Sequence, residues 1–269
     1  MEPAALLQSP LFAPLHPILA DLEAGGFPTL QDCNALLTSR PLLITVQSGS
    51  PLRFVAQECG KLPFEAQYEP RCYLKGEVQM RAHNWHDLLN ALVWLTFPKT
   101  KSILNARHYD ALIEERASAI PRRGAVRDVN TLLDESGVIV VYADADLAEL
   151  LRNFKWKELF WQRREQVRAG MGFYLFGHGL YEKALQPYVG MTGQGLLLAV
   201  EPVFFSWPLA QQLAYLDSLL ADYLAALEHC RSTRDLSPVP LLGVPGWAAD
   251  NNCAAYYDNT AYFRPGRRG

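Results

Sequence analysis

Proline spacing limits what the first third of this chain can fold into. Nine of the 18 prolines lie among the first 70 residues, and proline interrupts helices and central strands because it lacks a backbone N–H and has a fixed φ. We therefore expect short helices and short extended segments here. The pattern predicts a helix over residues 30–37 and strands over 42–46, 53–56 and 73–80.

The rest of the chain is mainly helical in pattern. Apolar residues recur at helical spacing, and several of these segments end at a proline. The predicted helices cover residues 86–97, 100–116, 144–154, 156–168, 178–185 and 208–230, with short strands at 173–176 and 196–200.

Residues 129–142 predict a β-hairpin. Two apolar segments, 131–133 and 138–142, flank a polar stretch that ends at Gly137, which can supply the positive φ of a tight turn. The hairpin would form part of a small antiparallel sheet.

One domain accounts for the whole chain. Its 269 residues, 49% of them hydrophobic, are enough to close a single core, and we find no internal repeat or low-complexity linker. We expect a predominantly helical single α+β domain over 1–269. It would have a proline-rich part with short elements (1–80), a helical and hairpin core (81–236) and an irregular tail (237–269).

Composition excludes several protein classes. The five cysteines contain no C-x-x-C pair, which disfavours a zinc ribbon, an iron–sulfur site and a disulfide framework. The longest apolar stretch, 88–97, is about half of the ~20 residues that a bilayer requires, and the N-terminus lacks a signal-peptide pattern. We expect a cytoplasmic protein with no membrane partner. A formal charge of −3 gives no overall attraction to nucleic acid, so any such binding would be local.

The densest polar cluster lies at 83–90, where the chain enters a predicted helix. It contains His83, His86, Asp87 and Asn90. Capping explains part of it: Asn84 is a typical N-cap and Asp87 the acid three residues later. Capping does not explain two histidines that flank a tryptophan.

A second cluster follows a buried aromatic segment. His178 and Glu182 are spaced i, i+4 on a predicted helix, so the carboxylate can orient the imidazole or share a metal ion with it. A surface hydrogen bond is the simpler alternative, since this spacing is common. Glycines on both sides of His178 allow a backbone or ligand to approach closely.

These clusters lead to our first functional hypothesis, a metal-assisted hydrolase with a His/Asp/Glu cleft. No nucleophile elbow, phosphate-binding loop or dinucleotide fingerprint is present. Nitrogen and oxygen ligands without cysteine favour zinc, manganese or iron. The candidate residues are His83, His86, His178 and Glu182 as metal ligands, Asp87 or Asp128 as base or orienting group, and Asn90 and Arg127 as ligand-binding residues.

The second hypothesis is a non-enzymatic module that binds an anionic ligand or nucleic acid. Residues 152–168 carry six basic and two acidic side chains interleaved with four aromatic ones, including Trp156. Arg163 and Arg164 would then contact the ligand, as basic and stacking groups do in nucleic-acid sites. An amphipathic helix that buries its aromatic side chains explains the same pattern.

Several motifs together resemble a known family. They are HNWHD (83–87), LNALVWLTFPKTK (89–101), RD (127–128), LDESG (133–137), FGHGLYEK (176–183) and LGVPGW (242–247). Over about residues 13–265 the chain resembles the bacterial family catalogued as domain of unknown function 3025. The resemblance implies a one-domain bacterial protein and assigns no activity to it.

Overall fold

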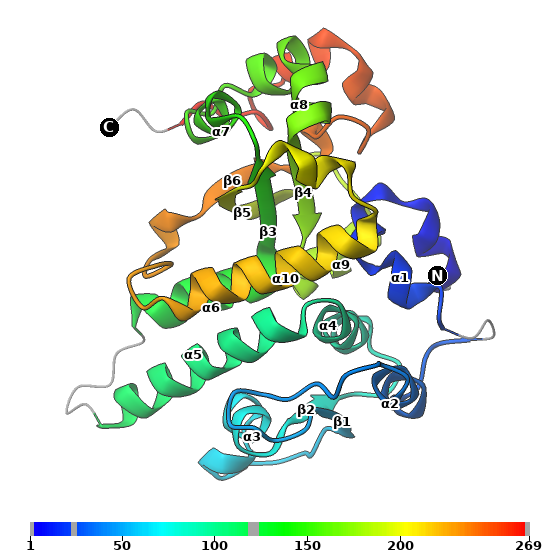
Figure 1. The fold of residues 1–269 in the computed structure, drawn as a ribbon, viewed down its shortest axis with the longest axis vertical. Coiled ribbons are helices and arrows are strands. Elements are labelled where there is room, and N and C mark those ends of the chain that lie inside the picture. Colours follow the sequence, from blue (N-terminus) through cyan, green and yellow to red (C-terminus); the bar gives the residue numbers. More distant parts are fainter. Residues whose placement is uncertain (1–2, 23–25, 118–123, 267–269) are drawn as a thin grey trace.

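The larger sheet forms the centre of the fold. A computed structural model describes residues 3–22, 26–117 and 124–266 (Figure 1). The sheet has the order β4-β3-β5-β6, with β3 at Gly137–Tyr142, β4 at Met171–Leu175, β5 at Thr192–Ala199 and β6 at Ser237–Pro240. β3 is antiparallel to β4 but parallel to β5. The expected antiparallel sheet is therefore mixed.

β3 is the most buried strand of this sheet. Val138, Ile139, Val140 and Val141 are all fully buried, which is the continuous apolar run of a strand covered on both faces. It follows the helix α6 (Ala125–Ser136) directly. The predicted hairpin at 129–142 is wrong in its first half, because Val129 and Leu133 are buried at helical i, i+4 spacing. Gly137 adopts a φ of −67° and makes no turn of positive φ.

A second, two-stranded parallel sheet lies in the first third of the chain. It pairs β1 (Arg53–Ala56) with β2 (Glu77–Met80) and is flanked by α2 (Leu30–Thr38) and α3 (Tyr68–Lys75). The strand predicted at 73–80 is thus half helix, and α3 ends at Gly76, whose φ is +68°. The strand predicted at 42–46 contributes a single bridge, Thr45 to Pro51.

The remaining helices fill the space between and around the two sheets. They are α1 (His16–Leu19), α4 (Trp85–Thr96), α5 (Pro98–Ala117), α7 (Ala145–Arg152), α8 (Arg164–Gly170), α9 (His178–Ala184) and α10 (Leu209–Ala225). In Figure 1, α4 and α5 lie between the small sheet and the large one. None of the helices that the structure describes is long and apolar enough to cross a bilayer. The predominantly helical α+β class is confirmed.

Short helical turns complete the described chain. One is a π-helical turn, Glu158–Gln162. The 3₁₀ turns are Pro3–Gln8, Pro10–Leu15, Phe64–Ala66, Pro202–Ser206, Thr233–Asp235, Leu241–Gly243, Ala249–Asn252 and Ala254–Asp258. The last three place the expected irregular tail in successive tight turns.

A backbone junction fixes the start of α9 against the end of α6. The N–H groups of Phe176 and Gly177 both donate to the carbonyl of Gly137, at 3.0 and 2.9 Å. A Cβ at position 177 would lie 2.5 Å from the backbone nitrogens of Ser136 and Gly137. Only glycine allows this approach, which sets His178 beside Glu135.

The basic and aromatic segment at residues 152–168 packs against the C-terminal tail. Trp156, Leu159 and Phe160 are buried, as an amphipathic segment requires. Arg164 is also buried, and its guanidinium donates to the backbone oxygen of Asn251 and to the side-chain oxygens of Asn251 and Asn252 at 2.8–3.1 Å. Its charged group therefore holds the tail in place.

The Gly177 junction predicts a steric effect on stability. We expect Gly177→Ala to lower the free energy of unfolding by about 2 kcal/mol, because the methyl group overlaps backbone atoms that cannot move aside. Urea denaturation measures the change. Gly170→Ala is the matched control, since a Cβ there meets no atom within 4 Å. An equal, small effect of both substitutions would contradict the junction's role.

The tail contacts predict different outcomes for the two adjacent arginines. Arg164→Met should cost about 2–4 kcal/mol, because it leaves buried oxygen acceptors without donors. Arg163 is exposed, so Arg163→Met should change stability by less than about 0.5 kcal/mol. The same urea assay compares the two variants, and a similar loss in each would argue against a structural role specific to Arg164.

Candidate metal centre

His86 enters the site from the first turn of α4. Asn84 caps this helix: its side-chain oxygen accepts a hydrogen bond from the backbone N–H of Asp87 at 3.0 Å. The capping interpretation of Asn84 is therefore confirmed. The cap fixes where the helix begins, and thus where His86 is placed.

His178 comes from the first residue of α9, and only 7% of its side chain is exposed. Its Nε2 lies 3.0 Å from Nε2 of His86, across 92 residues of sequence. The expected meeting of the two histidine clusters thus occurs for one histidine of each. Two imidazole nitrogens approach this closely only when a proton or a metal ion lies between them.

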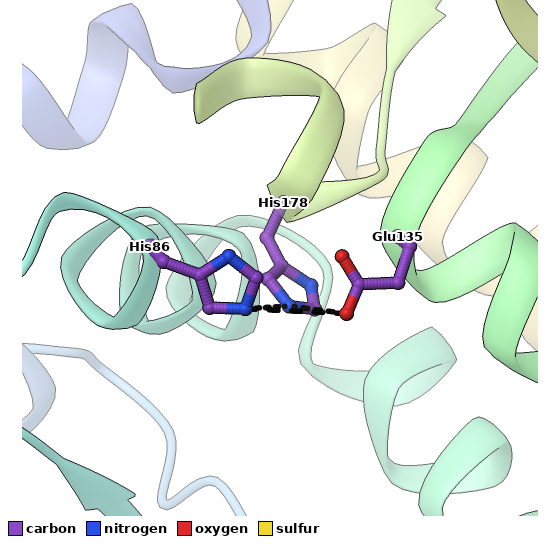
Figure 2. Close-up of side chains that lie close together, drawn as sticks. All are labelled: His86, Glu135 and His178. Carbon is purple, nitrogen blue, oxygen red and sulfur yellow. Dashed lines mark hydrogen bonds and ion pairs between the residues drawn. The ribbon is translucent and has the colours of Figure 1, made fainter. Parts of the chain in front are cut away.

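Glu135, at the end of α6, is the third group at this point. Its Oε1 lies 3.6 Å from Nε2 of His178 and 3.9 Å from Nε2 of His86. Figure 2 shows the three side chains converging from three helices. A point equidistant from atoms at these separations lies about 2 Å from each, which is the length of a zinc–nitrogen or zinc–oxygen bond. The triad can therefore hold a metal ion.

Carboxylates lie behind both imidazoles. Nδ1 of His86 is 2.9 Å from Oε2 of Glu182, and Nδ1 of His178 is 3.7 Å from Oδ2 of Asp134. The Glu182 carboxylate favours the His86 tautomer that carries its proton on Nδ1, so the lone pair of Nε2 faces inward. The longer distance at His178 is an electrostatic contact and not a hydrogen bond. The arrangement at His86 is that of histidines that bind a metal through Nε2.

Asp134 is held by a buried lysine. Lys101, with 4% of its side chain exposed, forms an ion pair with Oδ1 of Asp134. Burial alone would raise the pKa of Asp134, but the charge of Lys101 lowers it below its ordinary value. The carboxylate is thus ionised beside His178.

Burial shifts the pKa of two further groups of the centre, His178 and Glu135. It lowers the pKa of His178 to about 4 despite the opposing attraction of Asp134. It also raises the pKa of Glu135, against the attraction of His86. His178 is therefore neutral near pH 7, the state in which an imidazole binds a metal.

The triad opens into a polar cavity of about 240 Å³. Part of its wall belongs to the layer of the small sheet and part to α4, α6 and α9. The lining residues are Gln57, Tyr68, Glu69, Gln79, Arg81, His86, Asp87, Asn90, Asp134, Glu135 and His178. A reactant near the triad would contact mainly polar groups.

The structure places the other residues of the first histidine cluster differently. His83 is exposed and has a φ of +52°, and its ring lies 5.6 Å from that of Phe27, outside the cavity wall. Asp87 lines the cavity, but the backbone N–H and guanidinium of Arg81 donate three hydrogen bonds to it. Burial opposes ionisation of Asp87, yet these bonds lower its pKa overall, which makes it a weak base. Asn90 does line the cavity, one helical turn beyond His86.

Of the five other predicted site residues, four lie away from the triad. Arg127 forms an ion pair with Glu115, as expected of an anchoring arginine. Asp128 is exposed on α6 and does not line the cavity. Arg163 is exposed, and Arg164 bonds to the tail. Glu182 does not join the three converging atoms, because it faces the opposite nitrogen of His86.

Sequence reasoning missed Glu135, Asp134, Lys101 and Tyr68. The first two were assigned to a hairpin turn, although the helical spacing of Val129 and Leu133 would have placed them at a helix end. No local signal marks Lys101 or Tyr68, whose partners lie elsewhere in the chain.

Comparisons with known proteins give a family but no activity. No curated protein and no solved structure matches the chain significantly. A family model described as "Protein of unknown function (DUF3025)" matches residues 52–267, which include every residue of the triad and of the cavity wall. This match covers most of the sequence, and the chain therefore belongs to that family.

Proposed function

We propose that this protein is a metal-dependent hydrolase whose metal ion is bound by His86, His178 and Glu135. One observation carries the proposal: Nε2 of both histidines and a carboxylate oxygen surround a single point, while each Nδ1 faces a second carboxylate. Structural ion pairs alone do not require two Nε2 atoms to face each other. A shared divalent ion accounts for that arrangement.

The number of ligands supports a catalytic rather than a structural ion. Structural zinc sites use four protein ligands, whereas catalytic sites use three and leave a position open. When bound, the metal would lower the pKa of a coordinated water and polarise a substrate oxygen. In this chain Glu182 orients the imidazole of His86, and the cavity admits a reactant.

The donor set narrows the choice of metal. Two imidazoles and a carboxylate, without a thiolate, suit zinc, manganese(II) or iron(II). Zinc is the natural first probe because it has no redox chemistry and takes this ligand set in known hydrolases.

The alternative of an anionic-ligand module receives less support. Of its two proposed contact residues, Arg163 is exposed. Arg164 is buried and donates its hydrogen bonds to Asn251 and Asn252. The aromatic side chains beside it pack in the core.

Metal binding is the first test. Isothermal titration of tag-free, chelator-treated protein with zinc should give one ion per chain. His86→Ala, His178→Ala and Glu135→Gln should each weaken binding at least 100-fold, because each removes one of three ligands. His83→Ala is the matched control, and its affinity should equal that of the unmodified protein.

Hydrolysis is then tested with a panel of ester and amide substrates. Activity of the zinc-loaded protein should disappear with a chelator and in His178→Ala, and should remain in His83→Ala. Unmodified protein that binds no divalent metal would overturn the proposal, as would hydrolysis that the chelator leaves intact.

The neutral state of His178 predicts a pH dependence of stability in the metal-free protein. Because its pKa is about 4 in the fold and 6.5 as a free side chain, the unfolded state binds more protons between these values. Stability is then complete above about pH 6.5 and falls as the pH drops toward 4, by about 3 kcal/mol in all.

Chemical denaturation at a series of pH values measures this loss. His178→Gln does not titrate, so the unmodified protein should lose about 3 kcal/mol relative to it over that window. Parallel stability curves for the two proteins would show that His178 titrates normally in the fold.

A further inference from the structure

A chain of hydrogen bonds reaches from the buried lysine toward the cavity. Nζ of Lys101 lies 2.9 Å from the side-chain oxygen of Asn90. An ammonium group can only donate, so this contact fixes which end of the Asn90 amide is the oxygen. The amide nitrogen of Asn90 then points to the hydroxyl of Tyr68, at 2.6 Å.

The orientation of the Asn90 amide determines whether the Tyr68 hydroxyl accepts from it or donates to it. Because the Asn90 nitrogen donates, the Tyr68 oxygen accepts, and the hydroxyl must donate its own proton elsewhere. Among the residues described here, Tyr68 has no acceptor within hydrogen-bond distance. Tyr68 lines the same cavity as His86 and Glu135, and burial raises its pKa well above the ordinary value. It therefore presents a hydroxyl donor, not a phenolate, to a molecule in the cavity.

The charges around the cavity select against anions. Its wall includes four carboxylates, Glu69, Asp87, Asp134 and Glu135. The one cation of the wall, Arg81, is bound to Asp87, and the adjacent Lys101 is bound to Asp134. Recognition of phosphate or carboxylate uses cations that are free to pair with it, and apart from the proposed metal ion this wall offers none among its described residues.

We propose that the substrate is an uncharged amide or ester, and that Tyr68 donates a hydrogen bond to its carbonyl oxygen beside the metal. This inference rests on the proposed metal-dependent function. Attack on a carbonyl places negative charge on that oxygen, and a donor already held in direction stabilises the charge. Asn90 and Lys101 act as positioning residues, since they fix the direction of the Tyr68 hydroxyl.

The test uses the zinc-loaded 269-residue protein and two small probes of the same size. Acetamide is uncharged and presents a carbonyl oxygen, whereas acetate is an anion near pH 7. Isothermal titration should show that acetamide binds at least as tightly as acetate, although acetate is the stronger ligand of a bare zinc ion. Tighter binding of acetate would overturn the uncharged substrate class.

Two variants test the hydroxyl and its direction. Tyr68→Phe should weaken acetamide binding about tenfold, because it removes one hydrogen bond to the carbonyl oxygen. Asn90→Asp should weaken it similarly: an aspartate accepts from both Lys101 and Tyr68, which turns the hydroxyl proton away from the cavity. Tyr73→Phe is the control, because Tyr73 lies on the same helix but stacks on Tyr109 outside the cavity wall.

Zinc stoichiometry, measured first on each protein, separates the two proposals. If Tyr68→Phe binds one zinc ion and binds acetamide as tightly as the unmodified protein does, the role of Tyr68 is overturned and the metal centre stands. If the unmodified protein binds none of zinc, manganese(II) and iron(II), both proposals fall. Circular dichroism confirms that each variant is folded.

Discussion

The contact between Gly177 and the end of α6 is the constraint on which the candidate centre depends. The carbonyl of Gly137 receives two backbone N–H groups, and position 177 has no room for a side chain. The same junction starts β3, the central strand, and α9, which carries His178. The geometry of the triad is therefore coupled to the position of the sheet, and not to a loop that could move independently.

Burying charged side chains at the centre costs desolvation free energy, and the stability of the fold alone does not explain why they are there. Lys101 and Asp134 are largely removed from water, and such pairs contribute little net stability because desolvation opposes their attraction. The two residues of the pair instead position their neighbours. Asp134 places a carboxylate behind His178, and Lys101 fixes the orientation of the Asn90 amide. Two parts of one cavity are thus organised by a single ammonium group.

Local sequence signals were sufficient for part of this architecture. Asn84 and the proline at 98 bound α4, so His86 could be placed on a helix entry from the sequence. Glycines around His178 correctly indicated a close backbone approach. Glu135 was lost because residues 131–133 were interpreted as a strand, an error of periodicity over a short segment. Contacts such as Lys101 with Asp134 depend on how distant helices pack, which no local pattern contains.

The cavity wall is shared by two layers of the molecule. Tyr68 and Glu69 come from α3, beside the small sheet, whereas the triad comes from the helices α4, α6 and α9. A molecule that occupies the cavity would touch both layers at once. The free energy of its binding would then add to that of the contacts between the two layers. Occupancy of the cavity would therefore couple the unfolding of the small sheet to that of the large one.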